Sequence, residues 1–338
     1  MTAERPASSR NKLLLAGALG VTIGALGLAA SAPERLLQAE FARQRWLAGA
    51  DPLDFEIAGH RWASVAAGPR DAPLLVLVHG FTGSKENWYP LAERLGGHYR
   101  LVIPDLPGWG ESQRIAGEDY GFRAQAARLA DFLRAVRRDG NPVVVLGHSM
   151  GGGIVALTAA EHPDLVARVA LVDAAGVRFA DNAFGLEVLA GRNPFGVYDA
   201  ASLQRYLDIV FHDRAAQPAI PWPASKAVID WRIAQAPFEQ QVLDRIGRGG
   251  ERFLPGEMAA AIRQPALLLW CRQDRVIDPS AMALYARQMP QAIQVSLDGC
   301  GHMSIMEKPD DVAAAVALLA WFLPRAPVLA FSAGLLRA

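Results

Sequence analysis

The feature that most constrains the fold is the segment Gly147-His148-Ser149-Met150-Gly151, which directly follows the apolar run 143–146 and precedes a helical pattern. A strand that reverses this sharply into a helix leaves no room for Cβ atoms beside the turn, so glycines flank it. The central side chain is then presented at a helix N-terminus, where backbone N–H groups favour developing negative charge. The sequence therefore predicts that Ser149 is a nucleophile at a strand-turn-helix junction.

From about residue 54 onward, short apolar runs alternate with amphipathic stretches. This alternation indicates a largely parallel sheet covered by helices on both faces. The predicted strands are 55–57, 62–66, 74–78, 101–103, 143–146, 169–172, 266–270 and 293–297, and the predicted helices are 89–95, 122–136, 151–160, 280–289 and 310–322. The fold class is therefore α/β, with a mostly parallel eight-stranded sheet.

The alternation breaks between residues 177 and 257, a segment that we call the insertion. It has no clear strand pattern but contains many aromatic side chains. We expect it to be a helical cap on a core formed by 54–176 and 258–324. The remaining segments are 1–32 at the N-terminus, 33–53 as a helix and linker, and the tail 325–338. Within the linker, residues 49–52 have the composition of a turn.

Composition excludes several classes of function. Lys+Arg and Asp+Glu number 34 each, so the chain has no basic excess for binding nucleic acid. The two cysteines, Cys271 and Cys300, cannot form a cysteine-rich zinc site. We expect two buried thiols, with a disulfide between them as the alternative. No metal ion and no organic cofactor is predicted.

The N-terminus carries an export or anchoring signal. Residues 13–30 are free of charge and follow Arg5, Arg10 and Lys12. As a helix this run would rise about 27 Å, close to the thickness of the hydrocarbon core and longer than a secretory signal requires. A retained membrane anchor is predicted; the alternative is cleavage after the small residues 30–32, which would release a secreted protein.

The flanks of this segment suggest how the protein is placed at a membrane. Basic residues on both sides nearly balance, and the N-terminal amine tips the prediction towards a cytoplasmic N-terminus and a catalytic domain on the periplasmic side of an inner membrane. Gly20 and Gly24 would permit close helix packing, so a homodimer through this face is a hypothesis. Residues 33–48 are expected to form an interfacial helix, or an ordinary helix packed on the domain.

A serine hydroxyl needs a base to remove its proton. His302 follows the last predicted strand in Gly299-Cys300-Gly301-His302, where a loop could reach Ser149, so it is the predicted base. His148 adjoins the serine, but neighbours on a tight turn cannot easily face each other. The other histidines have no motif to support them.

The third group must be a carboxylate that orients the imidazole. Asp274 follows the strand 266–270 and gives the chain order Ser149, Asp274, His302, so it is the predicted acid. Asp173 ends the preceding strand and is the main alternative. Asp278 precedes Pro279 and is expected to cap a helix.

An oxyanion hole needs two preorganised N–H donors. We predict the backbone N–H groups of Met150 and Phe81, the latter on the loop after the strand 74–78. His79 is expected to brace that loop. Further candidates for substrate contact are His79 itself and three aromatic residues of the insertion, namely Phe211, Trp222 and Trp231. Core packing accounts for most aromatic side chains of the insertion.

With these residues in place, the chain resembles the α/β-hydrolase superfamily of serine esterases and lipases. The resemblance rests on HGFTGSKENW (79–88), PDLPGWGES (104–112), GHSMGG (147–152), WCRQDRVID (270–278) and CGHMSIMEKP (300–309). Within the superfamily it is most similar to membrane-anchored monoacylglycerol lipases, related bacterial lipases and inner-membrane phospholipases A1. The resemblance implies an α/β-hydrolase fold with Ser149 as nucleophile, Asp274 as acid and His302 as base.

The expected activity is hydrolysis of carboxylic esters through an acyl-enzyme on Ser149, releasing fatty acid from acylglycerols or glycerophospholipids. A phospholipase A1 or lysophospholipase in lipid remodelling is an alternative within this class. Carbon-carbon bond hydrolases and perhydrolases of the same fold are a second alternative. A catalytically silent lipid-binding module is the non-enzymatic one.

Overall fold

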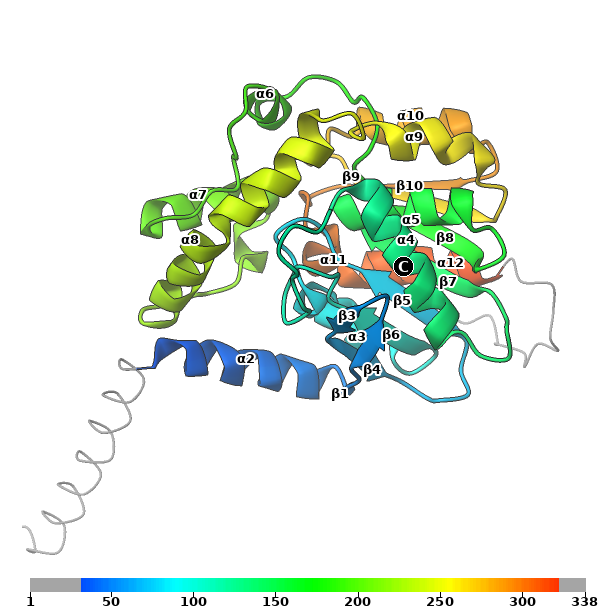
Figure 1. The fold of residues 1–338 in the computed structure, drawn as a ribbon, viewed down its shortest axis with the longest axis horizontal. Helices are drawn as coiled ribbons and strands as arrows, with labels where there is room; N and C mark the ends of the chain where they lie inside the picture. The colour runs from blue at the N-terminus through cyan, green and yellow to red at the C-terminus, as the bar shows by residue number, and fades with distance from the viewer. Residues whose placement is uncertain (1–31, 322–338) are drawn as a thin grey trace, which may run out of the picture.

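The computed structural model describes residues 32–321 and is built on one eight-stranded sheet (Figure 1). The order is β1-β4-β6-β5-β7-β8-β9-β10, in which β1 and β4 pair antiparallel, β4 and β6 pair antiparallel, and the other neighbours are parallel. The bounds are β1 (Ala50–Pro52), β4 (Ser64–Ala67), β6 (Arg100–Pro104), β5 (Leu74–Val78), β7 (Val143–His148), β8 (Val166–Val172), β9 (Ala266–Cys271) and β10 (Ile293–Leu297). The predicted mostly parallel eight-stranded sheet is confirmed.

Two details at the edge of the sheet differ from the prediction. Residues 55–57 do not join the main sheet; they form β2 (Phe55–Ile57), which pairs only with β3 (His60–Trp62). The first strand of the main sheet is instead β1, inside the segment expected to be a turn. Pro52 is tolerated there because an edge strand has one side without ladder hydrogen bonds.

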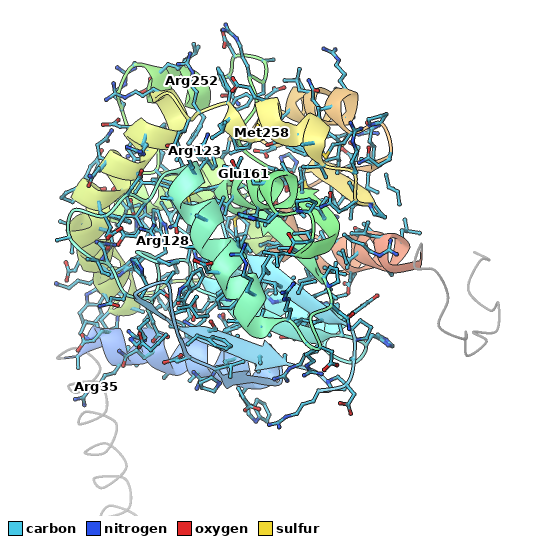
Figure 2. The ribbon with its side chains drawn as sticks, turned by 45° about the vertical axis from the view of Figure 1, so that its right-hand side comes forward. Arg35, Arg123, Arg128, Glu161, Arg252 and Met258 are labelled. Carbon is cyan, nitrogen blue, oxygen red and sulfur yellow. A yellow bond between two sulfur atoms is a disulfide. The ribbon has the colours of Figure 1, made fainter. Side chains whose placement is uncertain are left out.

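Two helix layers cover the sheet (Figure 1). On one face, α4 (Phe122–Val136) packs on α5 (Met150–Glu161), which lies against β7 and β8; on the other, α3 (Tyr89–Leu95) packs on α12 (Pro309–Trp321). An ion pair of 3.1 Å between Arg123 and Glu161 joins α4 to the end of α5 (Figure 2). The central strands are buried on both faces because of these layers.

The insertion is helical, and it leaves the sheet after β8 and returns before β9. It contains α6 (Ala183–Leu189), α7 (Ala200–Val210), α8 (Ala224–Leu243) and the first residues of α9 (Leu254–Met258). Arg232 on α8 is buried and donates to Glu239 and to the carbonyl of Phe195, both at 2.9 Å. A buried charged pair that also binds backbone fixes α8 against the segment before α7.

Helix α2 (Pro33–Leu47) runs along the molecule and packs against α8 and β1 (Figure 1). Its first residue is proline, whose missing N–H costs nothing at that position. None of its residues is fully buried. No helix within residues 32–321 is both long and apolar enough to span a bilayer. The predicted anchor 13–30, with Gly20 and Gly24, lies outside the described residues, as does the tail 325–338.

Candidate active site

Ser149 occupies a strained turn between β7 and α5. Its backbone has φ 55° and ψ −122°, in the left-handed half of conformational space. A Cβ on Gly151 would lie 2.3 Å from the carbonyl oxygen of His79, and one on Gly147 would lie 2.3 Å from that of Gly151. The two glycines that flank the serine are therefore required by backbone packing, as the motif indicated.

His302 lies on the loop between β10 and α11 (Ser304–Glu307), at hydrogen-bond distance from the serine. The distance from His302 Nε2 to Ser149 Oγ is 2.9 Å, and both side chains are buried. Burial lowers the pKa of His302 to about 3, so the imidazole is neutral at neutral pH. A neutral imidazole with Nε2 facing the hydroxyl can accept the serine proton.

Asp274 completes the chain of hydrogen bonds. Its Oδ2 accepts from His302 Nδ1 at 2.8 Å, which leaves Nε2 as the acceptor for Ser149. Its Oδ1 accepts from the N–H groups of Val276 at 2.7 Å and Ile277 at 3.0 Å. Burial raises the pKa of Asp274, and these two N–H donors oppose that rise.

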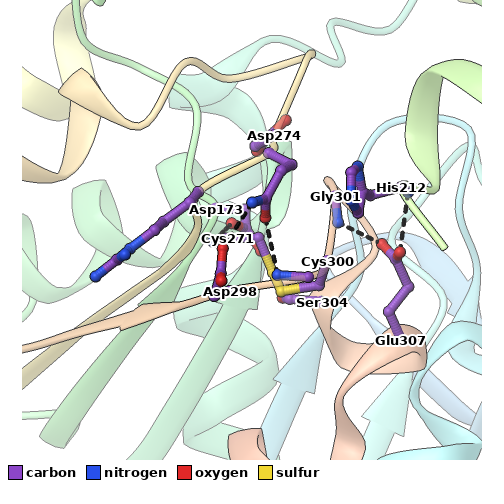
Figure 3. Close-up of a disulfide and its surroundings, with 12 residues drawn as sticks. Asp173, His212, Cys271, Asp274, Asp298, Cys300, Gly301, Ser304 and Glu307 are labelled. Atoms are coloured by element: carbon purple, nitrogen blue, oxygen red, sulfur yellow. Dashed lines mark hydrogen bonds between the residues drawn. A yellow bond between two sulfur atoms is a disulfide. The ribbon is translucent and has the colours of Figure 1, made fainter.

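The two alternative carboxylates lie elsewhere. Asp173 Oδ1 accepts from the N–H of Cys271 at 2.9 Å, and its Oδ2 accepts from the hydroxyl of Ser304 (Figure 3). Burial, and next the nearby charge of Asp274, raise the pKa of Asp173. Asp278 Oδ1 accepts from the N–H of Ser280 at 2.9 Å, at the start of α10 (Ser280–Gln288). Among the three carboxylates considered from the sequence, only Asp274 contacts the imidazole of His302.

The loop that carries Phe81 passes directly beside the serine. A Cβ on Gly80 would lie 2.8 Å from the Cβ of Ser149, so the backbone that leads to Phe81 runs close to the serine. Met150 is the first residue of α5, where N–H groups have no acceptor within the helix. Both residues line the cavity that holds Ser149. That these two N–H groups form the oxyanion hole stays a prediction.

Three buried hydrogen bonds brace this loop. His79 Nδ1–H donates to the carbonyl of Gly80 at 2.8 Å, and its Nε2 accepts from the N–H of Leu106 at 2.9 Å. Burial lowers the pKa of His79 to about 4. Lys85 donates to the buried carboxylate of Asp105 at 2.8 Å. These roles of Lys85 and Asp105 were not inferred from the sequence, although both residues belong to motifs that carried the family resemblance.

The two cysteines form a disulfide, which corrects the expectation of two buried thiols (Figure 3). Cys271 ends β9 and Cys300 follows β10, and their Cα atoms are 5.4 Å apart. Parallel pairing of β9 with β10 places both residues at the same end of neighbouring strands. The disulfide therefore joins the segments that carry Asp274 and His302.

His148 has a role that sequence reasoning missed. Its ring faces the base loop, with Nε2–H donating to the carbonyl of His302 at 2.7 Å. The rings of the two histidines have centroids 4.8 Å apart. Burial lowers the pKa of His148 to about 3, so it remains a neutral donor. The residue before Ser149 thus supports the loop of His302 through its backbone.

The cavity beside Ser149 has a volume of about 170 Å³ and mostly apolar walls. Its walls come from Phe81 and Met150, from the end of α8 and, above all, from the segment around α6, with Phe179, Phe184, Val188, Leu189, Phe195, Leu243 and Ile246. Such a cavity can hold a hydrocarbon chain with its carboxyl end at the serine.

The candidate substrate residues from the sequence do not line this cavity. Trp222 is 72% exposed and Trp231 is 42% exposed, both on the outside of the insertion. Phe211 is buried in the interior after α7, and His79 is buried with its Nε2 accepting from the N–H of Leu106. Composition identified the aromatic segment but not which side chains face this cavity, and contact of these residues with substrate stays a prediction.

Over residues 32–321, no group of three or more His, Cys, Asp or Glu side chains is arranged to bind a metal ion.

Comparison with known proteins agrees with this fold. The model of the alpha/beta hydrolase fold family matches residues 73–309. Lipase 1 of Psychrobacter immobilis is 32% identical over 242 residues, 71% of this chain and 74% of that protein. Monoacylglycerol lipase ABHD6 of Homo sapiens is 26% identical over 249 residues, 71% of this chain and 73% of that protein. The crystal structure of a membrane phospholipase A, a bacterial virulence factor, matches with a TM-score of 0.80 and 31% identity, covering 91% of this chain and 98% of that one.

Proposed function

The chain belongs to the alpha/beta hydrolase family and is a lipase or esterase of that fold, and on this premise we propose that it releases fatty acid from lipid esters through an acyl-enzyme on Ser149. The observation that carries the proposal is the buried chain of hydrogen bonds from Ser149 Oγ to His302 Nε2, at 2.9 Å, and from His302 Nδ1 to Asp274 Oδ2, at 2.8 Å. These hydrogen bonds end at Ser149, which lines an apolar cavity.

In the first half-reaction, Ser149 Oγ attacks the ester carbonyl while His302 Nε2 accepts the hydroxyl proton. Asp274 stabilises the imidazolium that forms. The N–H groups of Phe81 and Met150 stabilise the tetrahedral oxyanion, each contributing on the order of 3 kcal/mol. His302 then gives its proton to the leaving alcohol, and the carbon–oxygen bond to that alcohol breaks.

In the second half-reaction, water attacks the acyl-enzyme and gives one proton to His302. The new tetrahedral intermediate collapses as His302 returns that proton to Ser149, and the fatty acid leaves. The imidazole needs the same orientation in both halves, which the bond to Asp274 maintains.

The acyl chain of the substrate would occupy the cavity that α6 helps to line. Each buried methylene contributes about 0.8 kcal/mol, or about a fourfold gain in kcat/KM, until the cavity is filled. Two leucines of α6 allow a matched test, because Leu189 lines the cavity whereas Leu186 does not, and their exposed fractions are 50% and 52%. Leu189→Asp should weaken hydrolysis of long-chain esters more than Leu186→Asp.

Membrane association is the proposed setting for this activity. Most of the large apolar side chains exposed in the described residues lie on α2 and on the insertion, among them Trp46 and Trp222. The 13–30 segment is apolar and precedes α2 directly. We propose that this segment anchors the chain, with Gly20 and Gly24 available for pairing in a homodimer.

A disulfide supports the periplasmic side of the inner membrane as the place of the catalytic domain. Disulfides persist in oxidising compartments and are rare in the cytosol. The Cys271–Cys300 bond adjoins the proposed acid and base, so the domain would mature where that bond can form.

The test compares fatty-acid release by the detergent-extracted protein from short-chain esters, monoacylglycerols, lysophospholipids and diacyl phospholipids. The proposal expects release from at least one lipid class, and no release by Ser149→Ala. Hydrolysis of short esters alone would restrict the activity to that of a general carboxylesterase. Equal release by the wild type and Ser149→Ala would refute the proposal.

A further inference from the structure

The loop of His302 is held from two directions. On the side of the sheet, the carbonyl of His302 accepts from His148 at 2.7 Å, and the preceding Cys300 is bonded to Cys271. On the opposite side, the N–H of Met303 donates to the carbonyl of Val210, the last residue of α7, at 3.0 Å. The base is therefore tied to the insertion as well as to the core.

Glu307 makes the second connection to the insertion (Figure 3). Its Oε1 accepts from the N–H of Gly301 at 2.7 Å, immediately before His302. Its Oε2 accepts from the N–H groups of His212 at 2.9 Å and Asp213 at 2.8 Å, just after α7. One carboxylate thus joins the base loop to the insertion with three hydrogen bonds, each strengthened by its charge.

The two segments that Glu307 joins are in direct contact. A Cβ on Gly301 would lie 2.7 Å from the backbone nitrogen of His212 and 3.2 Å from the carbonyl oxygen of Val210. Only glycine fits between the base loop and the end of α7. A shift of this part of the insertion must therefore move the backbone on both sides of His302.

We propose that Glu307 is a positioning residue, a proposal that rests on the function proposed for Ser149 and His302. Through Glu307, the hydrogen bond between His302 and Ser149 depends on the insertion being packed against the loop of His302. With the end of α7 in place, Glu307 and Val210 hold residues 301 and 303 so that Nε2 meets the hydroxyl. When the insertion moves away from the site, the hydrogen bonds of Glu307 and of Val210 are lost together. The base is then competent only when the insertion covers the site.

The first experiment uses Glu307→Gln and a small soluble ester such as p-nitrophenyl butyrate. Glutamine has the same shape, but its single carbonyl oxygen can serve only one side of the connection and its NH₂ group faces an N–H donor on the other. Because misplacement of a catalytic group by about 1 Å costs up to a hundredfold in rate, we expect kcat to fall about tenfold or more, with KM changed less than about twofold.

A second pair of variants tests the tie from the insertion alone. Asp213 has φ −83°, close to the value that proline imposes, so Asp213→Pro removes its N–H donor with a small change of φ at that position. Asp213→Ala is the matched reference, because it also loses the side chain that accepts from Ala215 but keeps the N–H. We expect kcat of Asp213→Pro to be about threefold or more below that of Asp213→Ala, because one of two charge-assisted bonds to the insertion is lost.

The outcomes separate this proposal from the proposed function. If Glu307→Gln keeps the wild-type kcat, or if only KM changes, or if Asp213→Pro equals Asp213→Ala, the positioning role is wrong although ester hydrolysis stands. If the wild type hydrolyses no ester, or Ser149→Ala is fully active, the proposed function fails first. Should Glu307→Gln fail to fold in thermal unfolding, the Asp213 pair alone decides.

Discussion

Removal of the disulfide between Cys271 and Cys300 should destabilise the protein by a calculable amount. The bond closes a loop with a sequence separation of 29 and connects β9 to the end of β10. In the chain-entropy treatment, a loop of this length reduces the entropy of the unfolded chain by an amount worth about 3.6 kcal/mol at 25 °C. For a domain of this size that difference corresponds to a fall in Tm of about 6 °C.

The assay is equilibrium unfolding in guanidinium chloride, with and without a phosphine reductant, of the wild type and of the double variant Cys271→Ala, Cys300→Ala. The reductant should lower the unfolding midpoint of the wild type, once the protein is unfolded and the bond exposed, and leave the double variant unchanged. The single variant Cys271→Ala controls for the loss of buried side-chain volume, because it breaks the same bond but removes one sulfur atom and not two. A loss of less than about 1 kcal/mol in the reduced wild type would refute the reasoning from loop closure.

Two further outcomes follow from the site. Gly151→Ala should destabilise the protein by about 1 to 3 kcal/mol, since its Cβ would lie 2.3 Å from the carbonyl oxygen of His79. Gly97→Ala is the control, because its Cβ meets nothing within 4 Å, and chemical denaturation measures the stability of both variants. Burial lowers the pKa of His79 from 6.5 to about 4. Above about pH 6.5 the imidazole is neutral in both the folded and the unfolded chain, and its stabilising contribution is complete. As the pH falls towards about 4, only the unfolded chain binds the proton, so about 3 kcal/mol of stability is lost. A His79→Gln variant should accordingly show a flatter fall of Tm between these pH values, and an unchanged slope would contradict the assignment.

Local patterns in the sequence predicted most of the scaffold. The six helices predicted outside the insertion begin and end within one residue of α2, α3, α4, α5, α10 and α12. Apolar periodicity supports the prediction of α4, whereas α5 is buried on nearly all sides. The turn at Ser149 was also predictable, since steric exclusion of Cβ atoms leaves a distinct spacing of glycines. The edge strand β1 was not, because pairing with β4 overrode the turn composition of residues 49–52.

The contacts that require knowledge of register could not be predicted. The disulfide depends on β9 and β10 being parallel neighbours, which brings Cys271 and Cys300 to the same end of the sheet. The contact of Glu307 with His212 joins residues that are 95 positions apart, through backbone N–H groups that no side-chain pattern records. Likewise, whether Trp222 faces the cavity depends on how the insertion packs and not on its composition.

The measurement that tests the central claim most directly is covalent labelling with a fluorophosphonate, located by peptide mass spectrometry. A serine hydroxyl reacts only if a neighbouring base takes its proton, and Ser149 is 2.9 Å from His302. We expect one adduct, on Ser149, and a labelling rate lower by about a thousandfold or more in a folded His302→Ala variant. An adduct on another residue, or wild-type labelling of His302→Ala, would contradict the account.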